Sequence, residues 1–239
     1  TGADVLAAGG TAVDAAIAAA VAAMVAEPVL AGLHGGGFLL MRSPGGRVRV
    51  LDMFVDTPRA KRAEGEVDIR EIHADFGDTT QAFRIGAGTV AASPLAPGLA
   101  EAHAAAGRIP FADLMAPAAA AARAGVPLTR YQAELAGIVA PILTASPAVR
   151  ALHWGEDRPK AGDRRANPDF ADVLEEYGRE GPRFVQEGEV AAALLALMAD
   201  GGHLGREDLG GVRPVWRDPA EMMRGDVRVA LNPPPALGG

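Results

Sequence analysis

Residues 33–40, LHGGGFLL, are the first part of the chain whose residue types could do chemistry. A His-Gly-Gly-Gly run before an apolar segment is the oxyanion-hole motif of one group of α/β-hydrolase esterases. Those enzymes also need a serine nucleophile in a G-x-S-x-G turn. The chain has three serines, Ser43, Ser93 and Ser146, and each directly precedes a proline outside such a turn. The esterase interpretation therefore fails, and the glycines must serve another purpose.

Other reactive side chains are scattered. The five histidines show no spacing typical of metal ligands, and they are His34, His73, His103, His153 and His203. The chain has no cysteine, which excludes disulfides, zinc–thiolate sites and thiol nucleophiles. We therefore expect no metal site and no cofactor, and we interpret His34 as a partly buried loop residue.

Composition describes a globular protein. Of the 239 residues, 49% are hydrophobic and 22% are charged, and the net charge is −7. The absence of a basic patch argues against nucleic-acid partners. The longest apolar run, 12–26, carries Asp14 and is shorter than the roughly 20 residues that a membrane span requires. No signal peptide is recognisable, and the composition leaves the compartment open.

The first two predicted elements are helices over 1–8 and 12–26. Gly9 and Gly10 end the first, and Thr11 with Asp14 forms a weak capping box for the second. Small residues occur on every side of 12–26, so we expect that helix to be buried on most faces. A charge at Ala19 would then prevent folding.

The remaining pattern predicts strands, a helical middle section and strands again. The segment SPGGR joins the first two predicted strands as a hairpin turn, and 55–85 reads as irregular. Strands are predicted over 38–42, 48–54, 89–93, 212–219 and 226–235. Helices are predicted within 98–107, 110–125, 129–143, 171–181 and 188–203, with a surface loop over 154–168. This order indicates a single α+β domain with a helical section.

Four separated blocks resemble the gamma-glutamyltranspeptidase family of N-terminal-nucleophile hydrolases. The first block is GGTAVDAAIAAAVAAMVAEPVLAGLHGGGFLLMR, which is similar to the family's opening helix, Glu-Pro, four-glycine loop and strand. It differs at two positions, where Thr11 replaces an asparagine and His34 replaces the first of the four glycines. The others are 107–129, 184–209 and 232–239. The resemblance gives Gly35, Gly36 and Gly37 a structural meaning, tight packing where the helix returns into a strand.

The resemblance implies a mechanism and a partner. Family members are precursors that cleave themselves before a threonine, whose hydroxyl then attacks an amide substrate while its own α-amine acts as base. The implied fold is a four-layer αββα sandwich, and 1–239 matches the front part of the large subunit. No catalytic residue is then expected in this chain, because the threonine belongs to the small subunit. Thr1 opens a predicted helix rather than a strand, and both chain ends look like cuts through a longer protein.

One family contact falls inside the chain. The family's D-x-R-E-x-A-P segment carries an arginine that binds the α-carboxylate of the γ-glutamyl group. Here Phe54 stands in its place and Val55 replaces the glutamate, while Arg59 and Arg62 follow closely. An apolar ring cannot make the bidentate guanidinium–carboxylate contact. Phe54 and Arg59 are therefore the predicted substrate-binding residues.

Three interpretations remain. The chain is part of a threonine amidohydrolase or acyltransferase with altered acyl specificity, or of a true gamma-glutamyltransferase whose carboxylate contact comes from another residue, for example Arg59. The third is a catalytically inactive relative with a binding role. A threonine followed by a strand pattern in the remaining sequence would favour an enzyme.

Overall fold

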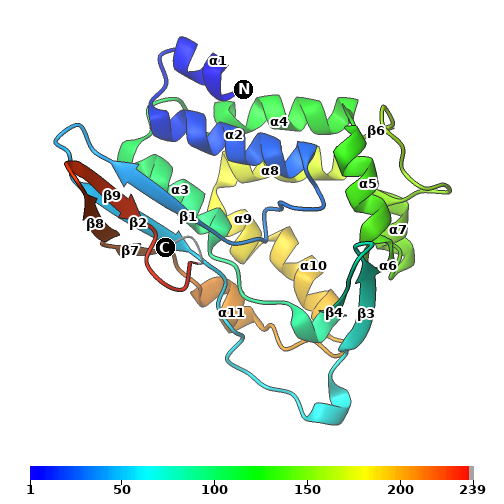
Figure 1. The fold of residues 1–239 in the computed structure, drawn as a ribbon. Coiled ribbons are helices and arrows are strands. Elements are labelled where there is room, and N and C mark those ends of the chain that lie inside the picture. Colours follow the sequence, from blue (N-terminus) through cyan, green and yellow to red (C-terminus); the bar gives the residue numbers. More distant parts are fainter. Residues whose placement is uncertain (237–239) are drawn as a thin grey trace.

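A computed structural model describes residues 1–236 as a mixed α/β structure (Figure 1). The helices of its N-terminal half are α1 (Gly2–Ala7), α2 (Ala12–Ala26), α3 (Leu95–Ala106) and α4 (Phe111–Ala124). Those that follow are α5 (Arg130–Ile138), α6 (Ala140–Leu143), α7 (Pro147–His153), α8 (Pro168–Glu180), α9 (Pro182–Gln186), α10 (Glu189–Met198) and α11 (Arg206–Gly211). Two 3-10 turns complete the set, η1 (Glu64–Glu66) and η2 (Ala87–Thr89).

The strands form one small sheet and several hairpins. Antiparallel pairing joins β1 (Gly37–Arg42), β2 (Val48–Met53) and β7 (Val215–Arg217) in the order β1-β2-β7. The predicted SPGGR turn closes β1 onto β2, with Gly46 at a φ of 84° that only glycine adopts readily. Separate pairs are β3 (Arg70–Asp75) with β4 (Thr80–Ile85), β5 (Val126–Pro127) with β6 (Arg164–Arg165), and β8 (Ala220–Arg224) with β9 (Val227–Leu231).

Helices cover one face of the three-stranded sheet. Leu51 and Met53 of β2 are buried in one cluster with Ile17 of α2 and with Leu95 and Leu99 of α3. Behind them α4 packs on α2 and, over most of its length, on α8 (Figure 1). This arrangement confirms the α+β class, and within residues 1–236 the helices lie on one side of the three-stranded sheet.

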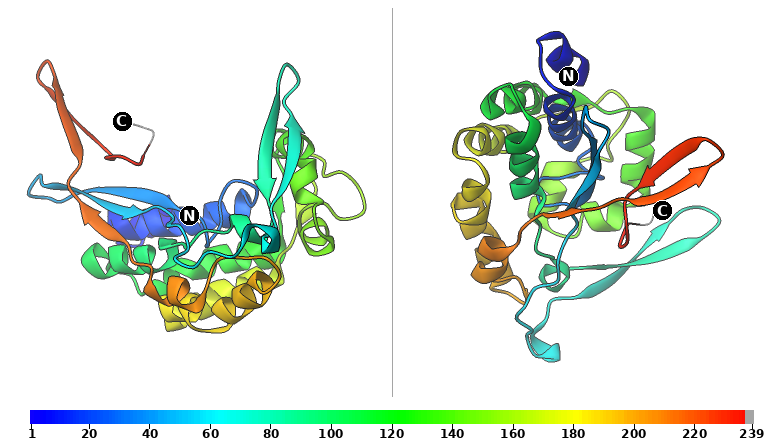
Figure 2. Two further views of the ribbon diagram at one scale, coloured as in Figure 1. Left: turned by 90° about the horizontal axis from the view of Figure 1, so that it is seen from below. Right: turned by 90° about the vertical axis from the view of Figure 1, so that its left-hand side faces the viewer.

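Two hairpins project from the side of the molecule opposite those helices. Figure 2 shows β3–β4 at one end and β8–β9 at the other. All five residues of β8 are exposed. The β8–β9 hairpin is therefore largely free of contacts with the rest of the described chain.

Several sequence predictions were wrong in this region. Residues 55–85 are not irregular throughout, since they contain η1 and the β3–β4 hairpin. The alternation was hard to detect because Ile72 and Ala74 are the only apolar residues of β3. Residues 89–93 are not a strand, because η2 precedes a single bridge between Asp56 and Ala92.

The helical section follows the prediction more closely. The expected helix over 129–143 is divided at Val139 into α5 and α6, and the expected loop over 154–168 contains β6. The sequence missed α7, α9, α11 and β8. The late strands correspond to β7 and β9, and the last three residues of the block 232–239 lie outside the described residues.

The burial of α2 differs from the sequence-based expectation. Its Thr11–Asp14 capping box is confirmed. However, only one side is fully buried, and Ala19 is exposed on the other side. Uniformly small side chains left the sequence without a signal for which face points inward.

Candidate substrate-binding site

The predicted site begins where β2 ends. The main-chain N–H of Phe54 donates to Oδ1 of Asp52 at 2.9 Å, and Nη1 of Arg217 in β7 donates to Oδ2 of Asp52 at 2.8 Å. One carboxylate thus fixes the chain at position 54 and ties it to the neighbouring strand.

The ring of Phe54 lies at the surface rather than in the core. It is 46% exposed and stacks on Phe38 of β1, with ring centroids 5.7 Å apart and planes 22° apart. An exposed aromatic ring held by a second ring offers a fixed apolar surface to a ligand.

Phe54 and Arg59 line the same open cleft of about 230 Å³. The main-chain N–H of Arg59 donates to Oδ1 of the buried Asp208 at 2.9 Å, which holds this segment against α11. Within residues 1–236, the Arg59 guanidinium has no ion pair or hydrogen bond. The structure therefore brings the two predicted residues together and leaves the cation available to the cleft.

Arg62 has a different role from Arg59. Its Nε donates to the carbonyl of Gly202 at 2.5 Å, and its Nη2 donates to the carbonyls of Met198 and Ala199 at 3.2 Å each. These bonds satisfy carbonyls at the C-terminal end of α10. Arg62 is absent from the cleft lining and acts as a structural cap.

Sequence reasoning missed two charged residues of the cleft, Asp56 and Arg213. Asp56 precedes Arg59 by three residues, but Arg213 comes from the segment before β7, far along the chain. Both are exposed. No local pattern in the sequence marks a contact over that separation.

The glycine loop packs tightly behind this site. A Cβ on Gly36 would come within 3.2 Å of Val55, and one on Gly35 within 2.9 Å of the Gly32 carbonyl. This confirms the structural interpretation for these two glycines. It is wrong for Gly37, around which no other atom of the described chain lies within 4 Å of such a Cβ.

His34 and Ser93 hold the loop in place. His34 is partly buried, as expected, and its Nε2 lies 3.0 Å from the Ala91 carbonyl, so this nitrogen carries the proton. The Ser93 hydroxyl donates to the Gly35 carbonyl at 2.5 Å. Burial lowers the pKa of His34 below its usual value, against the opposing effect of the Ala91 carbonyl.

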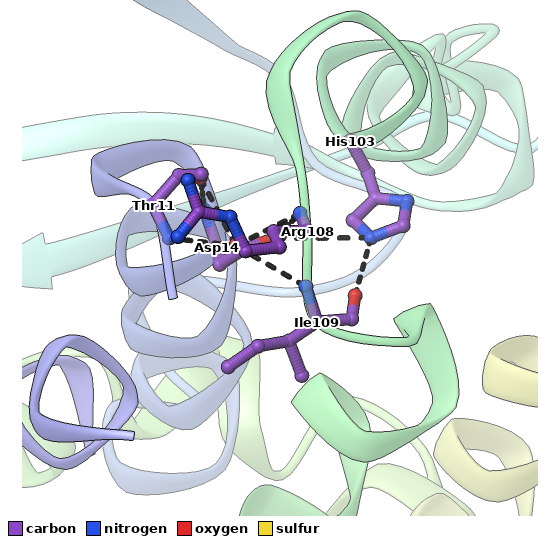
Figure 3. Close-up of polar contacts among 5 residues, drawn as sticks. All are labelled: Thr11, Asp14, His103, Arg108 and Ile109. Atoms are coloured by element: carbon purple, nitrogen blue, oxygen red, sulfur yellow. Dashed lines mark hydrogen bonds and ion pairs between the residues drawn. The ribbon is translucent and has the colours of Figure 1, made fainter. Parts of the chain in front are cut away.

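A second polar centre lies around Asp14 (Figure 3). This buried carboxylate accepts hydrogen bonds from the main-chain N–H and the hydroxyl of Thr11, at 2.8 and 3.0 Å, and from the N–H of Arg108 at 3.0 Å. The N–H of Ile109 lies at 3.4 Å, and Nε2 of His103, bonded to the Ile109 carbonyl, lies 3.8 Å away. Asp14 thus joins the start of α2 to the loop between α3 and α4.

The environment of Asp14 identifies a structural residue. Burial alone would raise the pKa of its carboxyl, but hydrogen bonds from Thr11, Arg108 and Ile109 outweigh burial and hold the pKa below its usual value. Five donor groups surround the two oxygens, which leaves little capacity for a ligand. Thr1 precedes α1 and opens a helix rather than a strand, as expected.

The described residues contain no candidate metal site and no candidate membrane span. No three His, Cys, Asp or Glu side chains within 1–236 lie close enough together to hold a metal ion. None of the helices in this range is both long and apolar enough to cross a membrane.

Comparison with known sequences decides the family. The profile described as gamma-glutamyltranspeptidase matches residues 1–239. The chain belongs to the gamma-glutamyltranspeptidase family. Similar curated relatives are the acylase ACY 1 proenzyme of Pseudomonas sp. (strain SE83), 32% identical, and the glutathione hydrolase proenzyme of Escherichia coli (strain K12), 31% identical. Both alignments cover the whole chain, which spans only 43% and 41% of the two relatives' lengths.

Solved structures agree with this assignment. The gamma-glutamyltranspeptidase from Pseudomonas nitroreducens, complexed with L-DON, matches with a TM-score of 0.83 and 26% identity. The match covers 98% of this chain and 68% of that one. The family fold, expected from the four sequence blocks, is therefore confirmed for this chain.

Proposed function

We propose that the chain is the large-subunit portion of a threonine amidohydrolase or acyltransferase whose acyl specificity is altered at Phe54. The nucleophilic threonine lies outside residues 1–239, in the small subunit of the same precursor. Its hydroxyl attacks the amide carbonyl and its α-amine takes up the proton, so the amine product leaves and an acyl-enzyme forms. Water or an acceptor amine then takes the acyl group. Family membership and the proenzyme relatives support this proposal.

The altered specificity rests on one observation, the exposed ring of Phe54 in the cleft. The family arginine at this place would bind the α-carboxylate of a γ-glutamyl group. A charge-assisted contact of that kind contributes roughly 1.5–3 kcal/mol. Its loss should weaken γ-glutamyl donors by about one to two powers of ten, whereas the ring favours an acyl group without the α-carboxylate.

A second candidate is a true gamma-glutamyltransferase that uses Arg59 for the carboxylate. It is favoured by the position of Arg59 in the same cleft, with a guanidinium that has no protein partner among residues 1–236. In that case Phe54 would only form the cleft wall.

The test uses the complete, processed protein. We would measure kcat/KM for γ-glutamyl-p-nitroanilide and butyryl-p-nitroanilide in the parent, Phe54→Arg, Phe54→Leu and Arg59→Ala. We expect Phe54→Arg to raise kcat/KM for the γ-glutamyl donor about 10- to 100-fold, and Phe54→Leu, the matched control, to leave it low.

Other results select among the alternatives. Efficient γ-glutamyl cleavage by the parent, lost in Arg59→Ala, would favour the second candidate. A processed parent that turns over neither anilide would contradict the altered acyl specificity and indicate an inactive relative with a binding role.

A further inference from the structure

Two phenyl rings lie together on the face of the three-stranded sheet that is turned away from the helices. Leu51 and Met53 of β2 pack toward the helices, so Asp52 between them points to the other face. Phe38 of β1 is paired directly with Asp52, and Phe54 follows Asp52 by two positions. The two rings stack with their centroids 5.7 Å apart. Phe38 therefore supports the exposed ring of Phe54 from outside the cleft lining.

The second feature of this cleft is a cation without a partner. Arg59 lines the cleft together with Phe54, and Asp208 fixes its main chain. Nη2 of Arg59 lies beside Gly211, another lining residue, at 3.9 Å from the place of an added Cβ. Within residues 1–236 no carboxylate or carbonyl accepts a hydrogen bond from this guanidinium. The cleft thus offers a ligand both a supported aromatic ring and a planar, weakly hydrated cation.

An aromatic group satisfies both features at once. Aromatic rings attract each other in offset-stacked and edge-to-face arrangements, and a guanidinium is attracted to the face of an aromatic ring. The chain already contains a contact of the second kind, since the guanidinium carbon of Arg49 lies 4.2 Å from the ring centroid of Trp216. An alkyl chain would remove water from Arg59 without giving the cation a new electrostatic partner.

The volume of the cleft sets the size of that aromatic group. The cleft measures about 230 Å³. A cavity of about 150 Å³ is sufficient for a benzene molecule. The cleft therefore has room for one phenyl ring and for the two carbons that would join this ring to the scissile amide.

We infer that the acyl group preferred by the complete enzyme is an arylacetyl group, whose ring lies between Phe54 and the Arg59 guanidinium. The threonine hydroxyl attacks the amide carbonyl, its proton passes through the α-amine to the leaving amine, and an arylacetyl ester remains. Water then releases the arylacetic acid and regenerates the hydroxyl. Phe38 is a positioning residue, because it acts through Phe54 without touching the substrate. This inference rests on the proposed function, since the acyl-enzyme forms on the threonine of the small subunit.

Two p-nitroanilides that differ in aromaticity test the ring contact. Phenylacetyl- and cyclohexylacetyl-p-nitroanilide share a leaving group and have acyl groups of similar size, so the ratio of their kcat/KM values reports the aromatic contact. For the complete, processed protein we expect a ratio of at least about five in favour of phenylacetyl. Phe54→Leu and Arg59→Gln should each lower this ratio about two- to tenfold. A parent ratio near one, or a ratio that neither variant changes, would overturn the inference.

Phe38→Leu tests the positioning role. We expect KM for the phenylacetyl substrate to rise about two- to tenfold, with kcat and the cyclohexylacetyl kinetics almost unchanged. Phe38→Tyr keeps the ring and should keep the parent ratio. The matched control is Phe76→Leu, at a phenylalanine that is 43% exposed between β3 and β4. A merely structural role of Phe38 would lower turnover of both substrates and leave their ratio unchanged, which would overturn the assignment.

Failure of this inference is distinguishable from failure of the proposed function. Cleavage of butyryl- or cyclohexylacetyl-p-nitroanilide without a preference for phenylacetyl would overturn the inference and leave the proposed activity intact. A parent that cleaves none of these anilides would overturn the proposed function, and binding would then test the aromatic site. Calorimetry would compare the neutral probes phenylacetamide and cyclohexylacetamide on the complete protein. Tighter binding of phenylacetamide, lost in Phe54→Leu, would support the site, and equal Kd values would overturn it.

Discussion

The carboxylates of Asp14 and Asp52 differ in how completely the protein satisfies them. Asp14 is fully buried and accepts main-chain hydrogen bonds from three residues in two segments of the chain, Thr11, Arg108 and Ile109. Asp52 bonds Phe54 and Arg217 at the edge of an open cleft that also exposes Arg59. A saturated polar group has a structural role, whereas a charge without a protein partner beside a cleft is free to bind a ligand.

The largest expected effect tests the structural side of this comparison. Asp14→Ala leaves the partly buried N–H groups of Thr11, Arg108 and Ile109 without their acceptor, so we expect the free energy of unfolding to fall by roughly 3–5 kcal/mol. Urea unfolding of the complete protein measures it. The exposed Asp4→Ala is the control and should change stability by less than about 0.5 kcal/mol. Similar losses in both variants would contradict the structural role of Asp14.

The corresponding substitution at the cleft, Asp52→Ala, should lower the free energy of unfolding less than Asp14→Ala does, and it should impair activity more. Asp52→Ala removes one hydrogen bond and one half-exposed ion pair, so we expect a loss of about 1–2 kcal/mol. Because position 54 is then less firmly held, KM for the acyl donor should rise more than kcat falls. Steady-state kinetics and urea unfolding of the same variant check both statements. A loss of stability equal to that of Asp14→Ala would mean that the main role of Asp52 is structural, as it is for Asp14.

A smaller effect concerns pH and the loop behind the cleft. Burial lowers the pKa of His34 and of His153 below the usual value of about 6.5. Between the folded-state and unfolded-state pKa of each imidazole, the unfolded protein binds more protons than the folded protein. The contribution of each neutral, buried imidazole to the free energy of unfolding is therefore fully present above about pH 6.5 and is lost as the pH falls through the folded-state pKa.

Urea unfolding at pH 7.5 and 5.0 measures this loss. We expect His34→Gln and His153→Gln each to remove part of the difference between the two pH values, and the double variant to remove more. An unchanged difference in the double variant would show that burial of these imidazoles does not control it.

The smallest effect corrects the sequence-based expectation for α2. Ala19 is exposed, so Ala19→Glu should fold and should change the free energy of unfolding by no more than about 0.5 kcal/mol. The matched change on the buried side, Ala18→Glu, should abolish folding because it places a charge in the core. Thermal unfolding of both variants tests which face of α2 is buried. Equal melting temperatures would mean that Ala18 and Ala19 do not lie on a buried and an exposed face.

The sequence alone determined elements with strong local signals. The Thr11–Asp14 cap, the tight turn at Gly46 and the close approach of Gly35 to the Gly32 carbonyl each depend on residues close together in the chain. The four ordered blocks likewise sufficed for the family, and Phe54 could be recognised as a departure because its motif is local. In each case the physical cause lies within a few residues of the signal.

Only the tertiary structure decided how distant segments meet. α2 has alanines on both sides, so packing against β2, α3 and α4, rather than its own sequence, selected its buried face. β3 and β4 form a hairpin through antiparallel main-chain pairing. Their sequences contain few apolar residues and lack the clear hydrophobic alternation that predicts a strand. Arg59 and Arg62 are three residues apart, yet one lines the cleft and the other caps α10. Partners more than a hundred residues away fix both positions, through Asp208 for the one and Gly202 for the other, and no local pattern encodes such contacts.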